Sequence, residues 1–140
     1  MARTVDPDVG DSRSPVTTPT ELEKLYRALV AGDLAAAQAL CSEDVVLHVP
    51  GRSQVAGSYR GPEGVVSYFR SLGELSNGTA TTTVDNVAVT TNKAVITQKV
   101  TADRSNKQLK DQQNVLLRIE AERVVEGFVY PFDLRVHDQF

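Results

Sequence analysis

The chain has 140 residues, of which 41% are hydrophobic and 24% are charged, and its formal net charge is -3. A chain of this length and composition folds around a single core. The negative charge argues against nucleic acid or an anionic membrane as the main partner, because both are bound through a basic face. The chain has neither an apolar run of the roughly 20 residues that cross a bilayer nor an apolar signal-peptide core, and we therefore expect a cytoplasmic protein.

Residues 1–17 contain Asp, Ser, Thr, Pro and Gly without any apolar repeat. Such a segment cannot bury enough surface to offset the entropy cost of ordering. We predict a disordered tail over residues 1–17, followed by one domain over residues 18–140. Cys41 is the only cysteine, so it cannot form an internal disulfide, and we expect it to be a buried structural thiol.

Three helices are predicted in the first half of the domain. Thr18 is placed to cap the first, and Gly32 ends it. Its apolar face repeats at helical spacing and consists of Leu22, Leu25, Tyr26, Leu29 and Val30. A shorter helix is expected over residues 34–41, and a strand over residues 45–49 follows it. The third helix opens on Pro62 and runs to about residue 75, because proline suits the first turn of a helix.

After Gly78 the sequence becomes rich in Val, Thr and Ile, which favour strands. The predicted strands cover residues 81–90, 93–104, 109–120 and 123–132. Their short polar connections imply antiparallel hairpins. Helices followed by hairpin strands are typical of the α+β class, in which the helices cover one face of a curved sheet. The open end of such a cone is a natural ligand pocket with apolar walls.

Several landmarks occur in a characteristic order along residues 20–140. They are Ala31-Gly32-Asp33, Val45-Val46-Leu47-His48-Val49 with Pro50-Gly51, Gly57-Ser58-Tyr59-Arg60-Gly61, Pro131-Phe132-Asp133 and His137-Asp138-Gln139-Phe140. In this order the chain resembles the SnoaL-like branch of the nuclear-transport-factor-2-like superfamily. The resemblance implies a cone-shaped α+β fold and a homodimer through the outer face of the sheet. The superfamily includes polyketide cyclases, ketosteroid isomerases, epoxide hydrolases and proteins without catalysis.

The last hairpin departs from the family pattern. Where relatives often have Asp-Gly, this chain has Glu120-Ala121-Glu122, which predicts a wider or type I connection rather than a tight turn with positive φ. A change of one residue in register would exchange the two faces of the final strand. Two pocket-facing sets therefore stay open, Phe128, Tyr130 and Phe132 or Val129, Pro131 and Asp133.

Two residues are candidates for acid/base chemistry. Asp133 follows the last strand, where SnoaL-like relatives often have an acid, and a carboxylate in an apolar cone is suited to proton transfer. The alternative is that Asp133 caps the C-terminal segment. His48 shares a strand face with Val46, and an imidazole at a pocket mouth could serve as acid or base, although a histidine in this position is also typical of a hydrogen-bonded wall.

Aromatic residues are the candidates for binding a hydrophobic small molecule. The predicted set is Tyr26, Tyr59, Tyr68, Phe69, Phe128 and Tyr130. Only two histidines are present, and no phosphate loop or dinucleotide fingerprint is found, so we expect neither a metal nor a cofactor.

The favoured function is that of a cofactor-free cyclase or isomerase of polyketide type. The first alternative is a noncatalytic binding or assembly module. The second is an epoxide hydrolase, for which Asp103 and Asp133 would supply the two acids, although Thr101 stands where an arginine is needed between them.

Overall fold

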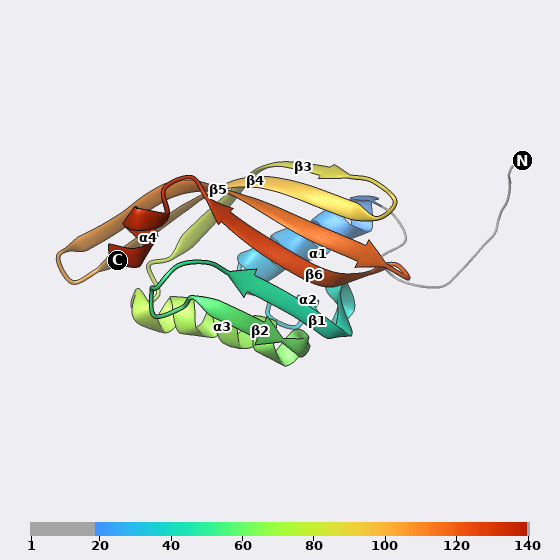
Figure 1. The fold of residues 1–140 in the computed structure, drawn as a ribbon, viewed down its shortest axis with the longest axis horizontal. Helices are drawn as coiled ribbons and strands as arrows, with labels where there is room; N and C mark the ends of the chain where they lie inside the picture. The colour runs from blue at the N-terminus through green and yellow to red at the C-terminus, as the bar shows by residue number, and fades with distance from the viewer. Residues whose placement is uncertain (1–18, 140) are drawn as a thin grey trace, which may run out of the picture.

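The computed structural model describes residues 19–139 and has the expected α+β fold. A curved, unclosed sheet of six strands is covered on one face by helices (Figure 1). The predicted tail over residues 1–17 lies outside the described residues. None of the helices between residues 19 and 139 is long and apolar enough to cross a membrane.

The order of the elements agrees with the sequence pattern and adds one strand and one helix. Along the chain they are α1 (Pro19–Val30), α2 (Ala36–Leu40), β1 (Cys41–Val49), β2 (Gly57–Arg60), α3 (Gly61–Leu75), β3 (Thr81–Val89), β4 (Lys93–Arg104), β5 (Lys107–Glu120), β6 (Arg123–Pro131) and α4 (Leu134–Gln139). Cys41 begins β1, where it pairs with Val124, instead of ending the second helix. It is buried, and burial raises the pKa of its thiol to about 11, as expected of a structural thiol.

The strands are arranged in the order β2-β1-β6-β5-β4-β3. All neighbours are antiparallel except β1 and β6, which run parallel and bring together the two halves of the chain. The core lies between the helices and the inward-facing residues of the sheet. Alternation is clear on β4, where Ala94, Ile96, Val100 and Ala102 are buried and the residues between them point away.

The turn between β5 and β6 is a correction to the sequence prediction. Ala121 and Glu122 both have positive φ, 49° and 68°, so the connection is the tight two-residue turn that was not expected here. Pairing along most of β5 and β6 holds these two residues in a conformation that their side chains disfavour. A bulge follows directly, because Ile119 pairs with Val124 whereas Arg118 pairs with Glu126.

This bulge decides which face of β6 points inward. Val124 is buried before the bulge, and Gly127 and Val129 are buried after it. The positions that point inward therefore change from even-numbered to odd-numbered residues within the strand. The pocket-facing set therefore follows Val129 and Pro131, and Phe128 and Tyr130 point to the outer face.

Candidate functional site

A cavity lies between the inner face of the sheet and the helices. Its volume is about 90 Å³, counted as the space open to the centres of water molecules, which is room for several waters or for one compact organic molecule. The walls come from the helices α1, α2 and α3, from every strand except β2, and from the loop between β1 and β2, and α4 contributes His137. Three of the predicted ligand contacts, Tyr26, Tyr68 and Phe69, line this cavity.

The walls carry almost no charge. Among the described residues, those that line the cavity include no Asp, Glu, Lys or Arg. Their polar side chains are Tyr26, Ser53, Tyr68, Thr82, Gln98, Gln113 and His137. An isolated ion would lose its hydration in such a space, so the cavity favours an uncharged, largely apolar molecule.

A chain of hydrogen bonds crosses one wall. The Tyr26 hydroxyl donates to Gln98 Oε1 at 2.6 Å, and Gln98 Nε2 donates to Gln113 Oε1 at 2.9 Å. Gln98 and Gln113 are direct cross-strand partners on β4 and β5, and each is 5% exposed. Burial raises the pKa of Tyr26 far above its usual value, so this phenol stays protonated and acts as a donor.

Tyr68 adds a second buried phenol from α3. Its ring contacts those of Tyr59 and Phe69 edge to face, with centroids 5.2 Å apart in both cases. Burial raises the pKa of Tyr68 to about 12. Tyr59 itself does not line the cavity, because its hydroxyl donates to the Val55 carbonyl at 2.7 Å and its ring supports Tyr68 from behind. The prediction that Tyr59 contacts a ligand in the pocket is therefore corrected: Tyr59 lies behind the cavity wall.

A histidine and a carboxylate meet at the edge of the cavity. His137 on α4 donates from Nε2 to Asp111 Oδ2 on β5 at 2.9 Å. The side chains are 15% and 9% exposed, so the pair is largely shielded from water. Asp111 Oδ2 also accepts from the Asp133 backbone N–H at 3.0 Å, which fixes the carboxylate from a second direction. A neutral imidazole held in this way can accept and return a proton.

The position of α4 is fixed by the loop between β1 and β2. The Arg52 backbone N–H donates to Asp138 Oδ1 at 2.9 Å. Gly51 has φ +98°, and a Cβ there would meet Asp138 Oδ1 and Leu134 Cδ1. Only glycine permits this close approach, which seats α4 and its His137 against the cavity.

The structure gives Asp133 a different position from the one expected. Its Oδ1 accepts from the Val136 backbone N–H at 3.4 Å at the start of α4, and its side chain is 41% exposed with Arg135 beside it at 3.7 Å. Asp133 is not among the residues that line the cavity. This geometry agrees with the alternative prediction, in which Asp133 caps the C-terminal segment. Asp103 lies at the exposed end of β4, so the two acids of the epoxide hydrolase alternative are not brought together at the cavity.

His48, Phe128 and Tyr130 lie on the outer face of the sheet, which corrects their expected position in the cavity. His48 stacks on Phe128 at 4.8 Å, and Phe128 stacks on Tyr130 at 6.2 Å. The physical reason is the bulge in β6, which turns Phe128 and Tyr130 away from the core. His48, opposite Phe128 on β1, faces outward with them.

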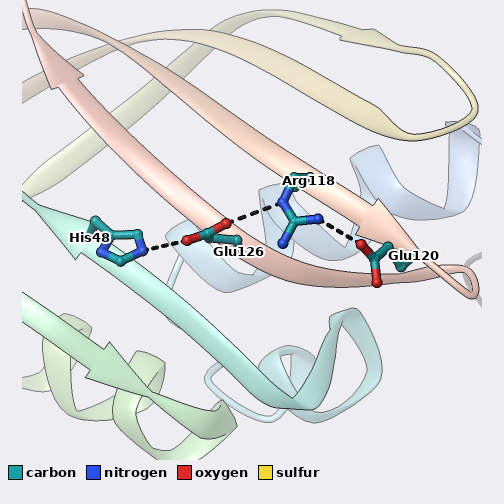
Figure 2. A network of polar contacts seen from close by, with 4 residues as sticks. All are labelled: His48, Arg118, Glu120 and Glu126. Carbon is teal, nitrogen blue, oxygen red and sulfur yellow. Dashed lines mark hydrogen bonds and ion pairs between the residues drawn. The ribbon is translucent and has the colours of Figure 1, made fainter.

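A row of ion pairs continues across this outer face (Figure 2). His48 Nε2 donates to Glu126 Oε2 at 2.7 Å, Arg118 Nε donates to Glu126 Oε1 at 3.1 Å, and Arg118 Nη1 donates to Glu120 Oε2 at 2.6 Å. The hydrogen bond from His48, followed by that from Arg118, holds the pKa of Glu126 below its usual value. Arg118 therefore pairs with both carboxylates of the row within one chain.

Four site residues were missed from the sequence: Gln98, Gln113, Asp111 and His137. Gln98 carries a signal, since it is the polar residue in an inward run of Ala94, Ile96, Val100 and Ala102. Gln113 likewise shares a face with Val115 and Leu117. The pairing of Asp111 with His137 depends on where α4 docks, for which the sequence holds no local signal. Among residues 19–139, no three His, Cys, Asp or Glu side chains gather as a metal-binding group.

Comparisons with known proteins agree with this architecture. The model of the SnoaL-like domain matches residues 22–127, so the chain belongs to the SnoaL-like family. An uncharacterized protein of Mycobacterium tuberculosis is 29% identical over 104 residues, which are 74% of this chain and 79% of that protein.

Solved structures give the same picture. Bal32a, from a soil-derived mobile gene cassette, superposes with a TM-score of 0.81 at 25% identity and covers 91% of this chain and 98% of its own. A protein of unknown function with a cystatin-like fold from Xanthomonas campestris has a TM-score of 0.75 at 30% identity, covering 85% and 94%. IdmH from Streptomyces antibioticus, described as a candidate polyketide cyclase, has a TM-score of 0.66 at 19% identity, covering 87% and 96%, and shares the fold alone.

Proposed function

We propose that this protein is a cofactor-free enzyme that moves protons on a hydrophobic small molecule, with the His137–Asp111 pair as its acid/base group. The observation that carries the proposal is that His137 lines an uncharged, mostly apolar cavity and is hydrogen-bonded from behind to the carboxylate of Asp111. Proton transfer by a positioned histidine contributes on the order of 10²–10⁴ in rate. Asp133 and His48 do not line the cavity, so the acid/base role predicted for them is assigned here to His137, supported by Asp111.

The hydrogen bond to Asp111 defines which atom is the base. Since Nε2 carries the proton that is donated to Asp111, Nδ1 is the nitrogen that accepts a proton. A C–H bond next to a ligand carbonyl would break, the proton would move to Nδ1, and the electron pair would form an enolate. Asp111 would stabilise the imidazolium until its proton is transferred. Transfer to a different carbon of a conjugated enolate is isomerisation, whereas attack of the enolate on a second carbonyl, followed by transfer of the proton to the resulting alkoxide, is cyclisation.

The names of structural neighbours suggest the kind of ligand. IdmH and a protein from Jannaschia are described as candidate polyketide cyclases, and both share this fold at under 20% identity. Polyketide chains have carbonyls separated by acidic C–H bonds, which suits the uncharged cavity. We therefore propose a polyketide-type or related carbonyl compound as substrate.

Hydrogen–deuterium exchange into β-tetralone in D₂O tests this proposal without knowledge of the natural substrate. The wild type is expected to accelerate exchange at the carbons beside the carbonyl, measured by proton NMR. His137→Gln is expected to remove most of the acceleration, and His48→Gln serves as the matched control because it removes the other histidine. A wild-type rate equal to that of buffer, with the ketone bound, would favour the noncatalytic binding module.

We also propose a homodimer through the outer face of the sheet. Val95 and Tyr130 are exposed there, His48 and Phe128 stack beside them, and the row from His48 to Glu120 already pairs its charges. Burying such a face in a second copy removes apolar surface from water at little electrostatic cost. The cytoplasmic location expected from the sequence stays a prediction.

A further inference from the structure

The chain of hydrogen bonds from Tyr26 has a fixed direction. Tyr26 is 5% exposed, and Gln98 Oε1 is the acceptor that its hydroxyl reaches. A buried hydroxyl needs an acceptor, so Gln98 must turn its oxygen toward Tyr26 and its amide nitrogen toward Gln113. Gln113 then accepts through its own oxygen, which leaves its NH₂ group as the last member of this series of hydrogen bonds.

This terminal NH₂ group faces the cavity without a partner. Gln113 lines the cavity and is 5% exposed, and within residues 19–139 nothing accepts a hydrogen bond from its Nε2. In this part of the chain Ser42 Oγ is the one fully enclosed polar side-chain atom without a partner, so Gln113 Nε2 keeps some contact with open space. A donor that borders a mostly apolar cavity and has no acceptor in the protein favours a ligand that supplies one. The uncharged walls make an uncharged oxygen the better acceptor than a carboxylate.

Gln113 also stands next to the proposed acid/base pair. Asp111 and Gln113 are two residues apart on the inward face of β5, a distance of about 7 Å along a strand. An oxygen bound at Gln113 Nε2 therefore lies on the same wall as His137, which is held by Asp111. A carbonyl in that position would present its neighbouring carbon toward the imidazole.

We infer that Gln113 Nε2 is the specificity-determining donor of this cavity and that it binds the carbonyl oxygen of an uncharged, apolar ketone. This inference rests on the proposed function and adds the protein group that would bind the carbonyl of its substrate. In the proposed reaction the same amide would hold the oxygen on which enolate charge develops. Tyr26 acts as a positioning residue, because its hydroxyl sets the direction of the amide chain.

Binding of a ketone and its hydrocarbon analogue tests the inference without any turnover. Calorimetry with β-tetralone and tetralin is compared between the wild type, Gln113→Met and the matched control Gln112→Met, whose side chain is exposed on the opposite face of β5. The wild type is expected to prefer the ketone. Gln113→Met should weaken ketone binding roughly three- to tenfold and leave tetralin unchanged, and Gln112→Met should change neither. The carbonyl stretch of bound β-tetralone should move to higher frequency in Gln113→Met only.

Tyr26→Phe tests the direction of the chain. Without the phenol, the amides of Gln98 and Gln113 can turn over together and present an acceptor instead of a donor. The affinity ratio of β-tetralone to its alcohol, β-tetralol, should therefore fall toward one, and this ratio cancels a general effect on cavity shape.

The inference is overturned if Gln113→Met leaves both ketone affinity and the carbonyl stretch unchanged, or if the wild type binds tetralin as tightly as the ketone or binds neither. Failure of the proposed acid/base function looks different. In that case the ketone would bind in a Gln113-dependent way, while the wild type would not accelerate its deuterium exchange.

Discussion

The inner and outer sides of the sheet each hold a histidine bound to a carboxylate, and the surroundings of the two pairs differ. His48 and Glu126 are 38% and 26% exposed on the outer face, whereas His137 and Asp111 are 15% and 9% exposed beside the cavity. On the outer face, water and ions weaken every charge interaction. Beside the cavity, the same pairing acts in a low-dielectric space that an apolar ligand can enter.

The comparison shows that the surroundings of a histidine–carboxylate pair, and not the pair alone, decide whether it can serve in catalysis. His48–Glu126 is one part of a row that continues to Arg118 and Glu120, so its carboxylate is already paired with a guanidinium on the surface. His137–Asp111 has no such neighbours along the cavity wall. The predictions below separate the two sides of the sheet, from the largest expected effect to the smallest.

Exchanging each carboxylate for its amide should separate the two pairs most clearly. Asp111→Asn is expected to lower the enzyme-catalysed deuterium exchange into β-tetralone by on the order of 10²–10⁴, because an amide neither fixes the tautomer nor stabilises the imidazolium. Glu126→Gln, the same change on the outer face, should leave the rate nearly unchanged. Equal rates in the two variants, measured by NMR on folded proteins, would contradict the assignment of His137.

The outer face should respond to charge through assembly rather than catalysis. Tyr130→Glu is expected to weaken the proposed dimer at least about 30-fold, because it places a charge in the centre of an apolar contact. Thr91→Glu adds the same charge at the exposed turn between β3 and β4 and should leave the dimer intact. Light scattering over a concentration series measures both, and a wild type that is monomeric at tens of micromolar would end the dimer proposal.

Substitutions of Asp133 test whether this residue caps α4 or takes part in proton transfer. As a cap of α4, Asp133→Ala should lower the free energy of unfolding by about 1 kcal/mol, and Asp133→Asn should change it little, because asparagine also caps well. Both variants should retain deuterium exchange. Loss of exchange in Asp133→Asn with an unchanged melting temperature would instead support the acid/base role first predicted from the sequence.

Much of the fold follows from local patterns. The bounds of β4 agree with the prediction, and those of β3 and β6 agree to within one residue, because β-branched alternation and short polar turns mark strands directly. The face of β6 does not follow from such patterns. It depends on the bulge in β6 opposite Arg118 and Ile119, and on two residues with positive φ, Ala121 and Glu122, whose conformation is imposed by strand pairing against their own preference.

The candidate site divides in the same way. Tyr26 and Tyr68 could be assigned from helical spacing, and Gln98 from its place in an apolar alternation. His137 and Asp111 are 26 positions apart and meet only because α4 docks beside Gly51. A contact between distant segments through a close backbone approach leaves no periodic trace in the sequence.

The outer ion pairs should contribute a modest, salt-sensitive part of acid stability. The pKa of Glu126 is lowered by the hydrogen bonds from His48 and Arg118, so its stabilising contribution is present above the unfolded value near 4.5 and is lost as the pH falls through the lower folded value. The melting temperature of Glu126→Gln should therefore fall less steeply than that of the wild type below pH 4.5. High salt should reduce the difference between the two proteins, because at about 1 M the screening length is only ~3 Å. A steeper decline in Glu126→Gln would show that the row of ion pairs opposes folding, and the outer face would then owe its stability to the stacked rings of His48, Phe128 and Tyr130 alone.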